Sequence, residues 1–182
     1  MVKAYAGIGS RKTPKHILEI MKQIGCRLAL MGWHLRTGAC QGADQAFAEG
    51  VVESHKKDPT PPLFRMTMCV PWESYEKKWI NSLDINFYTN ILKNSDKEAF
   101  MAVDRFHPAP HKLSQGARRL HARNHNILTE VKFVVCWTPE GKGTGGTGQA
   151  LREARARGIP IKDLGNPKTL DKVMKFLNSD SK

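Results

Sequence analysis

The chain has 182 residues and an apolar fraction of 40%, so it can bury the core of one domain without disulfide or metal staples. It holds no run of about 18 apolar residues and no apolar stretch like that of a signal peptide at its start, so we expect no membrane partner and a cytoplasmic location. Lysine and arginine number 29 against 17 acidic residues, a net charge of +12, which favours nucleic acid or a phosphorylated small molecule as partner.

Strands and helices alternate in the N-terminal half. Short apolar runs predict strands over 2–8, 33–37 and 63–70. Between the first two, apolar residues at helical spacing predict a helix that begins at Thr13-Pro14, because threonine can cap a helix and proline suits its first position, and that stops at Gly32. A second helix follows Asp44, and a charged, proline-rich connection over 56–62 leads to the third strand.

The second half begins with its least regular part, which lies within 55–115. The further elements predicted are, in chain order, short helices at 75–82 and 97–106, a long helix over 114–131, a strongly apolar strand over 133–137, a helix from Gly145 to Gly158, a strand from 159 and a capped amphipathic helix from 166. We expect a single domain over 1–178 and a frayed tail over 179–182.

Strands that alternate with helices pair in parallel, because a parallel connection needs a crossover long enough to hold a helix. Right-handed crossovers then predict a Rossmann-like three-layer α/β sandwich with a mostly parallel sheet of about five strands. In such sheets the ligand crevice lies at the carboxyl ends of the strands, where the strand order reverses.

Three glycine-rich segments follow predicted strands and fall at that edge, over 7–11, 38–44 and 138–147. Glycine lets the backbone approach a ligand closely, and the N-terminus of a helix offers free N–H groups and partial positive charge to an anion. With an arginine–asparagine pair that can grip a phosphate and read an amide or base edge, they predict these ligand-binding residues: Gly7, Gly9, Ser10, Arg11, Thr37, Gly38, Gly42, Asp44, Arg123, Asn124, Thr138, Gly145, Gly146 and Thr147.

Two common nucleotide motifs are absent from the sequence. Lys12 stands where the dinucleotide fingerprint G-x-G-x-x-G needs its third glycine, and no P-loop occurs, so we expect no bound NAD or other cofactor beyond a nucleotide-like ligand. Asp44 is predicted either to bind a ribose hydroxyl or to cap its own helix. Of the aromatic residues, Trp72 and Tyr75 follow the third strand at the ligand edge and are the best candidates for stacking on bases.

Between Arg105 and His125 the chain carries five cations and four histidines but no acid, which suggests an anion nearby. His121 and His125 share a helix face, yet no carboxylate lies at a matching interval, so we predict no metal site and expect the histidines to be protonatable partners of phosphate. The four cysteines lack metal-ligand spacing and are predicted to be free, buried thiols.

Four motifs occur in order with suitable spacing: Ala6-Gly7-Ile8-Gly9-Ser10-Arg11, Arg36 to Asp44, Arg123-Asn124, and Trp137-Thr138-Pro139 with Gly145 to Ala150. Over about residues 2–165 they resemble the SLOG superfamily and, within it, the small DprA/Smf-like proteins of tailed bacteriophages. The resemblance implies a Rossmann-like fold, a nucleotide-derived ligand or single-stranded DNA over the glycine-rich loops, and the host cytoplasm as location.

Two branches of this superfamily suggest different activities. The DprA branch loads a recombinase onto single strands, whereas the more distant LOG branch hydrolyses the N-glycosidic bond of a nucleoside monophosphate. Ala150 stands where the LOG motif has its glutamate, so hydrolysis would need another carboxylate, for which Asp44 and Glu73 are the catalytic candidates. Three functions therefore stay open: a nucleotide- or DNA-binding protein in recombination, sensing or sequestration, an N-glycosidic hydrolase or transferase, and a structural module that lost its pocket. Homo-oligomers are expected for this architecture.

Overall fold

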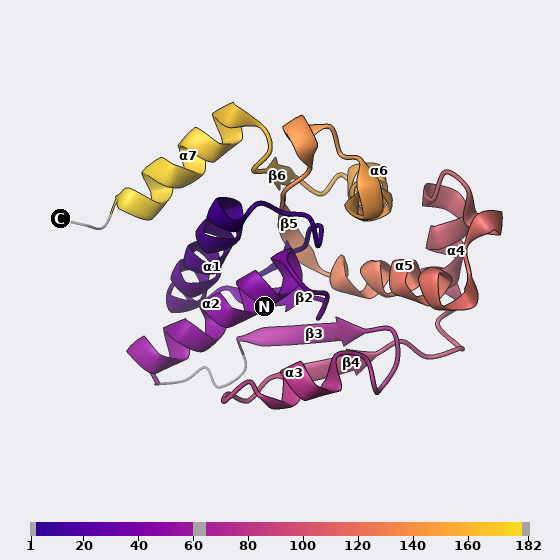
Figure 1. The fold of residues 1–182 in the computed structure, drawn as a ribbon, viewed down its shortest axis with the longest axis horizontal. Coiled ribbons are helices and arrows are strands. Elements are labelled where there is room, and N and C mark those ends of the chain that lie inside the picture. Colours follow the sequence, from indigo (N-terminus) through magenta and orange to yellow (C-terminus); the bar gives the residue numbers. More distant parts are fainter. Residues whose placement is uncertain (1–2, 60–64, 180–182) are drawn as a thin grey trace.

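The computed structural model describes residues 3–59 and 65–179. Its centre is a six-stranded sheet in which all neighbouring strands pair in parallel, in the order β4-β3-β2-β1-β5-β6 (Figure 1). The strands are β1 (Ala4–Gly7), β2 (His34–Thr37), β3 (Met66–Val70), β4 (Tyr88–Ile91), β5 (Val131–Cys136) and β6 (Ile161–Asp163). This arrangement confirms the predicted Rossmann-like α/β class.

Helices cover both faces of the sheet. They are α1 (Lys15–Leu30), α2 (Ala43–Lys57), α3 (Lys77–Asn81), α4 (Lys97–Phe106), α5 (Gln115–Ile127), α6 (Gly148–Ala156) and α7 (Pro167–Asn178), with single 3-10 turns η1 (Pro110–Lys112), η2 (Pro139–Gly141) and η3 (Gly145–Thr147). Helices α1, α2 and α7 lie on one side of the sheet, and α4, α5 and α6 lie on the other (Figure 1).

Two hydrophobic clusters follow from this layering. Tyr5 and Leu35 point from the sheet into the cluster that contains α1 and α2, while Ala6 and Val134 point into the cluster that contains α5 and α6. Every residue of β1 and β3 is buried, as expected for parallel strands that are covered on both faces. The loops at the carboxyl edge of the sheet are therefore anchored to strands that are packed on both faces.

The structure differs from the predicted elements where the local sequence carries a weak or misleading signal. Strand β4 was not predicted, because it lies at the edge of the sheet and exposes most of its side chains, so it has no apolar run. The helix predicted over 114–131 ends at Ile127, and Val131 already begins β5. Ser114 caps that helix by accepting a hydrogen bond from the backbone N–H of Ala117 at 3.2 Å.

The predicted cap of the first helix is also wrong. Helix α1 begins at Lys15 after Pro14, and no side chain caps it. Thr13 instead donates its hydroxyl hydrogen to the carbonyl oxygen of Ser10 at 2.8 Å, and so tightens the loop that follows β1. Thr13 thus stabilises the loop at the carboxyl edge of the sheet rather than the start of the helix.

Other terminators act as predicted. Gly32 and Gly158 follow their helices with φ of 79° and 66°, a conformation that suits glycine. Asn166 caps α7 by accepting hydrogen bonds from the backbone N–H groups of Lys168 and Thr169. The starts of the predicted first and third strands, part of the proline-rich connection and most of the predicted tail lie outside the described residues. Within the described part, no helix is both long and apolar enough to cross a membrane.

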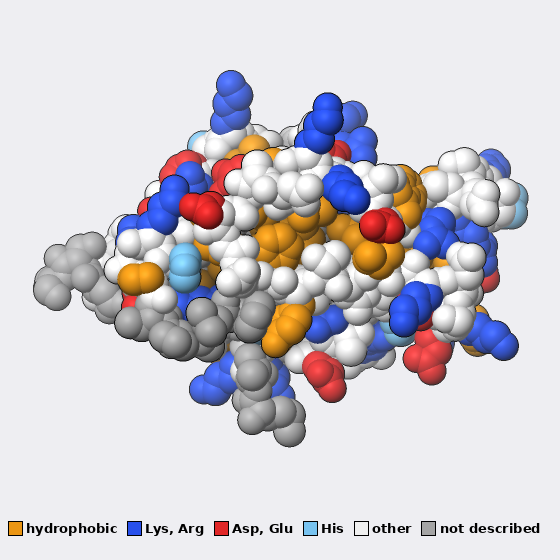
Figure 2. Space-filling view, turned by 90° about the horizontal axis from the view of Figure 1, so that it is seen from below, with side chains coloured by type: hydrophobic (Ala, Val, Ile, Leu, Met, Phe, Trp, Pro, Cys, Tyr) orange, Lys and Arg blue, Asp and Glu red, His pale blue; other side chains and the backbone are white. Residues whose placement is uncertain are grey.

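Figure 2 shows how the charges are distributed on one face of the molecule. Lysine and arginine side chains project around its rim and are not gathered in one patch, and apolar side chains lie between them. On this face the net positive charge does not by itself mark a binding surface.

Candidate functional site

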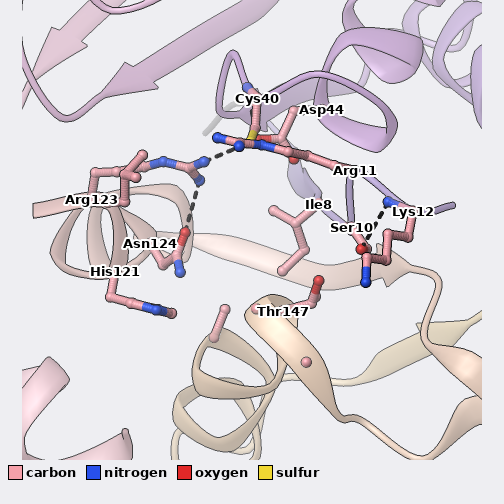
Figure 3. A pocket seen from close by; sticks show the side chains of 15 residues that line it. Ile8, Ser10, Arg11, Lys12, Cys40, Asp44, His121, Arg123, Asn124 and Thr147 are labelled. Atoms are coloured by element: carbon pink, nitrogen blue, oxygen red, sulfur yellow. Dashed lines mark hydrogen bonds and ion pairs between the residues drawn. The ribbon is translucent and has the colours of Figure 1, made fainter. Parts of the chain in front are cut away.

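A pocket of about 420 Å³ lies at the carboxyl edge of the sheet (Figure 3). The strand order reverses between β1 and β5, and the loops that follow these two strands face each other there. The pocket is lined by Ile8, Gly9, Ser10, Arg11, Lys12, Cys40, Asp44, Leu120, His121, Arg123, Asn124, Gly145, Gly146, Thr147 and Ala150. The position is the one that the fold class predicts for a ligand.

The three glycine-rich loops meet at this edge. Ser10, from the loop after β1, and Gly146, from the loop after β5, both line the pocket. Gly42 has φ of 90°, and a Cβ atom there would stand only 2.8 Å from the carbonyl oxygen of Ser10, so the second loop is pressed against the first. The first loop is closed by Ser10 Oγ, which accepts a hydrogen bond from the backbone N–H of Lys12 at 3.0 Å.

The structure divides the predicted ligand residues into two groups. Nine of them line the pocket: Gly9, Ser10, Arg11, Asp44, Arg123, Asn124, Gly145, Gly146 and Thr147. The other five do not line it but support it from behind: Gly7, Thr37, Gly38, Gly42 and Thr138.

Thr37 and Thr138 show what the supporting residues do. The Thr37 hydroxyl is buried and donates to the carbonyl oxygen of Gly7 at 2.6 Å, which ties β2 to the end of β1. Thr138 is also buried, and its hydroxyl group donates a hydrogen bond to the carboxylate of Asp163. The same hydroxyl oxygen accepts a hydrogen bond from the backbone N–H of Gly143 at 2.9 Å. Both hydroxyls therefore hold loops in place and are not directed at a ligand.

Asp44 and Arg123 form a buried ion pair on the pocket wall. Arg123 Nη2 lies 3.1 Å from Asp44 Oδ2, and the two residues are 6% and 2% exposed. Arg123 Nη1 donates to Asn124 Oδ1 at 2.8 Å, and Asn124 Nδ2 donates to Gln149 Oε1 at 2.9 Å. The guanidinium and amide that were predicted to grip a ligand are thus engaged with other side chains of the protein.

Asp44 does not cap its own helix. Gly42 occupies the N-cap of α2, and the Asp44 carboxylate accepts the backbone N–H of Cys40 at 3.4 Å. Burial raises the pKa of Asp44, while the adjacent guanidinium of Arg123 and the backbone amides of Cys40 and Gly9 oppose that rise. Glu73, the other catalytic candidate, is exposed, pairs with Lys77 at 3.7 Å and lies outside the pocket lining.

Three arginines of the basic stretch that ends at His125 are paired within the protein: Arg118, Arg119 and Arg123. Arg118 forms a two-pronged pair with Asp104, both contacts at 2.7 Å. Arg119 donates to the carbonyl oxygens of Pro71 and Leu92. The sequence suggested an external anion here. For Arg118 the carboxylate of Asp104, directly before the stretch, fills that role instead, and for Arg119 two carbonyl oxygens do so.

The cations of the pocket without an acidic partner in the described part of the chain lie in the loop that follows β1, residues 9–12. Arg11 and Lys12 are exposed on the pocket rim, and no carboxylate oxygen of the described residues lies within 4 Å of either cation. Thr147 is 5% exposed, and its buried hydroxyl has no hydrogen-bond partner. The hydroxyl points into the pocket toward Lys12 and Ser10 (Figure 3). Thr147 also immediately precedes α6, and Gly145 and Gly146 of the turn before it line the same pocket.

Lys12 and Cys40 line the pocket although they were not among the predicted ligand residues, and so does His121, which was expected only as a protonatable partner of phosphate. In the sequence, Lys12 replaces the third glycine of the dinucleotide fingerprint. That replacement is the signal from which Lys12 could have been predicted to line the pocket. Trp72 and Tyr75, the predicted stacking residues, pack edge-to-face against each other with ring centroids 5.3 Å apart and do not line the pocket.

His121 is held against His107, with ring centroids 4.7 Å apart, and its Nδ1 has no partner. Burial and then the neighbouring His107 lower the pKa of His121 to about 4. The imidazole is therefore neutral at pH 7, which contradicts the expectation of a protonated partner for phosphate. Among the described residues no group of three or more metal-ligating side chains is found.

The lowered pKa of His121 predicts a loss of stability in acid. Below pH 6.5 the unfolded chain binds a proton at this position, whereas the folded chain resists until about pH 4, so stability is lost across that window. Because the ring is only half-buried, we expect His121→Gln to reduce the loss by about 1 kcal/mol. Urea unfolding at several pH values measures it. His16→Gln, at an exposed histidine, is the control, and equal pH profiles for wild type and His121→Gln would refute the assignment.

Comparisons with known proteins support the fold. No protein-family model matches the chain, and no curated protein matches it significantly. DNA processing protein A from Helicobacter pylori, described for its unique single-stranded DNA binding mode, aligns with a TM-score of 0.62 and 17% identity over 98% of this chain and 80% of that one. The Moco carrier protein from Chlamydomonas rheinhardtii aligns with a TM-score of 0.52 and 15% identity over 98% and 86%. At these identities the likeness establishes a shared fold.

Proposed function

We propose that the pocket binds a phosphate-bearing, nucleotide-derived ligand or the phosphate end of a single DNA strand. The observation that carries the proposal is the buried hydroxyl of Thr147, which lacks a partner and points toward Lys12 (Figure 3). Lys12 and Arg11 both lie on the pocket rim without an acidic partner among the described residues. A phosphate in this space would accept from that hydroxyl and from Lys12, and the guanidinium of Arg11 would add positive charge at the rim.

Other parts of the pocket lining suit a sugar and a base. Leu120 and Ala150 offer apolar contact, and the neutral His121 leaves Nδ1 unpartnered. A pocket of about 420 Å³ lies within the usual size of small-molecule sites. Its presence speaks against a module that has lost its pocket.

The shared fold with DNA processing protein A makes single-stranded DNA the main alternative to a free nucleotide. We include in the proposal a DprA-like role in recombination, sensing or sequestration, in the cytoplasm of a phage-infected host, by a single domain that forms homo-oligomers. Salt separates the two ligands: the logarithm of the DNA affinity should fall by about 0.7 per contacted phosphate for each decade of salt, and should rise with strand length. A mononucleotide should show a shallow salt dependence.

Lys12 provides the direct test. Lys12→Ala should weaken the binding of a nucleoside monophosphate or of a phosphorylated oligonucleotide about tenfold, because a cation is removed from the phosphate end. Isothermal titration calorimetry measures the affinity. Lys132→Ala, at an exposed lysine of β5 away from the pocket lining, is the matched control and should leave affinity unchanged. Equal affinities for the two variants would contradict the proposal that the phosphate binds at this loop.

One observation favours a second candidate, an N-glycosidic hydrolase or transferase. Asp44 brings a carboxylate to the pocket wall, and Ala150, at the position of the LOG glutamate, lines the same pocket. Incubation with nucleoside monophosphates should then release free base, and Asp44→Asn should abolish the release. If the wild-type protein releases no free base, the hydrolase candidate is wrong and the binding function is the one retained.

A further inference from the structure

One cysteine of the four differs from the others in its surroundings. Cys26, Cys69 and Cys136 are buried, whereas Cys40 is partly exposed and lines the pocket. Burial raises the pKa of Cys26, raises that of Cys69 to about 11, and raises that of Cys136 well above its usual range. These three thiols are both inaccessible and protonated at neutral pH, so Cys40 is the thiol that a reagent in solution can reach.

The sulfur of Cys40 faces a cation. Arg11 Nε donates a hydrogen bond to Cys40 Sγ at 3.1 Å, and the guanidinium lies across the top of the pocket beside it (Figure 3). The nearby carboxylate of Asp44 is neutralised by Arg123. The guanidinium of Arg11 therefore places positive charge directly beside the sulfur, where it attracts a negatively charged reagent.

The pocket in front of this sulfur is prepared for a negatively charged group. Thr147, nine-tenths buried, directs an unpartnered hydroxyl into it, and Lys12 adds a second cation at the rim. We propose that Cys40 is a modification site that reacts selectively with negatively charged disulfides. The proposal rests on this geometry and goes beyond the proposed binding of a nucleotide, because it does not require that ligand.

The reaction is thiol–disulfide exchange. Cys40 loses its proton to solvent, and its sulfur attacks one sulfur of the disulfide; the new bond joins Cys40 to that sulfur, the old bond breaks, and the second sulfur leaves as a thiolate. Cys40 is oxidised to a mixed disulfide while half of the reagent is reduced, so the disulfide itself is the oxidant. The adduct would fill the pocket and displace Arg11 from the sulfur.

Two reagents of opposite charge test the proposal on the native protein: dithiobis(nitrobenzoate), a dianion, and cystamine, a dication. One thiol per chain should react quickly with the dianion. Relative to free cysteine, the dianion should be favoured over the dication by about tenfold or more, and the preference should shrink at high salt and in Lys12→Ala. Cys40→Ser should abolish the fast reaction, and peptide mapping of the modified wild type should place the adduct on Cys40 even if that variant folds poorly.

Fast modification of another cysteine, or equal rates with the two reagents, would overturn the proposal. The assay contains no nucleotide, so its failure differs from failure of the proposed function. A nucleoside monophosphate added beforehand should slow the reaction if both proposals hold. A charge-selective reaction at Cys40 that no nucleotide or oligonucleotide slows would support the modification site and count against the nucleotide.

Discussion

Replacing Arg123 by methionine should lower the free energy of unfolding by about 3–5 kcal/mol. The substitution keeps the aliphatic volume but leaves the Asp44 carboxylate, 2% exposed, without the charge that lies 3.1 Å from it. A buried carboxylate without a partner costs far more than the pair contributes, because its hydration is lost and nothing replaces it. Urea unfolding of the purified variant measures the change.

A double-variant cycle separates the pair from simple packing loss. Asp44→Asn combined with Arg123→Met removes both charges and should recover part of the stability that Arg123→Met loses. Lys132→Met, at an exposed lysine, is the control and should change stability by less than about 0.5 kcal/mol. A loss below about 1 kcal/mol for Arg123→Met would show that the guanidinium is available for a ligand, as the sequence alone suggested.

The difference between Arg11 and Arg123 marks a limit of sequence analysis. Both were predicted to hold a ligand, because each lies in a motif beside other polar residues. The partner of Arg123 lies 79 positions away in the chain, so only the folded structure shows that its charge is balanced. Likewise Asp104 pairs with Arg118, and the carbonyl groups of Pro71 and Leu92 accept from Arg119, in a basic stretch that contains no acid of its own.

The location of the site was more predictable than its composition. Loops that follow parallel strands must share one edge of the sheet, so the sequence alone could place Ser10 and Gly146 near each other. Strand β4 could not be predicted, since its exposed side chains leave no apolar pattern. A sequence also cannot distinguish a glycine that leaves space for a ligand from a glycine that leaves space for a side chain of the protein itself.

Gly7 and Gly146 illustrate that ambiguity. A Cβ atom on Gly7 would lie 2.7 Å from the Phe47 ring, so this glycine is required by packing. A Cβ atom on Gly146 would meet nothing within 4 Å, and its φ is not in the left-handed region. Gly146 therefore accepts a side chain without strain, and that side chain can be chosen to probe the charge of the pocket.

Gly146→Asp should abolish most binding of a phosphate-bearing ligand and leave the fold intact. A carboxylate at this position stands where the phosphate is proposed to bind, and like-charge repulsion should weaken affinity by about 2 kcal/mol or more, roughly 30-fold. The same carboxylate precedes α6, where negative charge stabilises a helix, so the melting temperature should be unchanged or slightly raised. Calorimetric titration with nucleoside monophosphates and thermal unfolding measure the two effects.

Gly146→Asn is the matched control, because asparagine has nearly the shape of aspartate without the charge. It should retain binding within a few-fold of wild type, so the difference between the two variants isolates the charge from any steric effect of the new side chain. Increasing salt should narrow the gap between them, because the repulsion is electrostatic and partly exposed to solvent. Equal affinity of Gly146→Asp and Gly146→Asn would mean that no anion binds beside α6, and the loops after β1 and β5 would then meet for structural reasons alone.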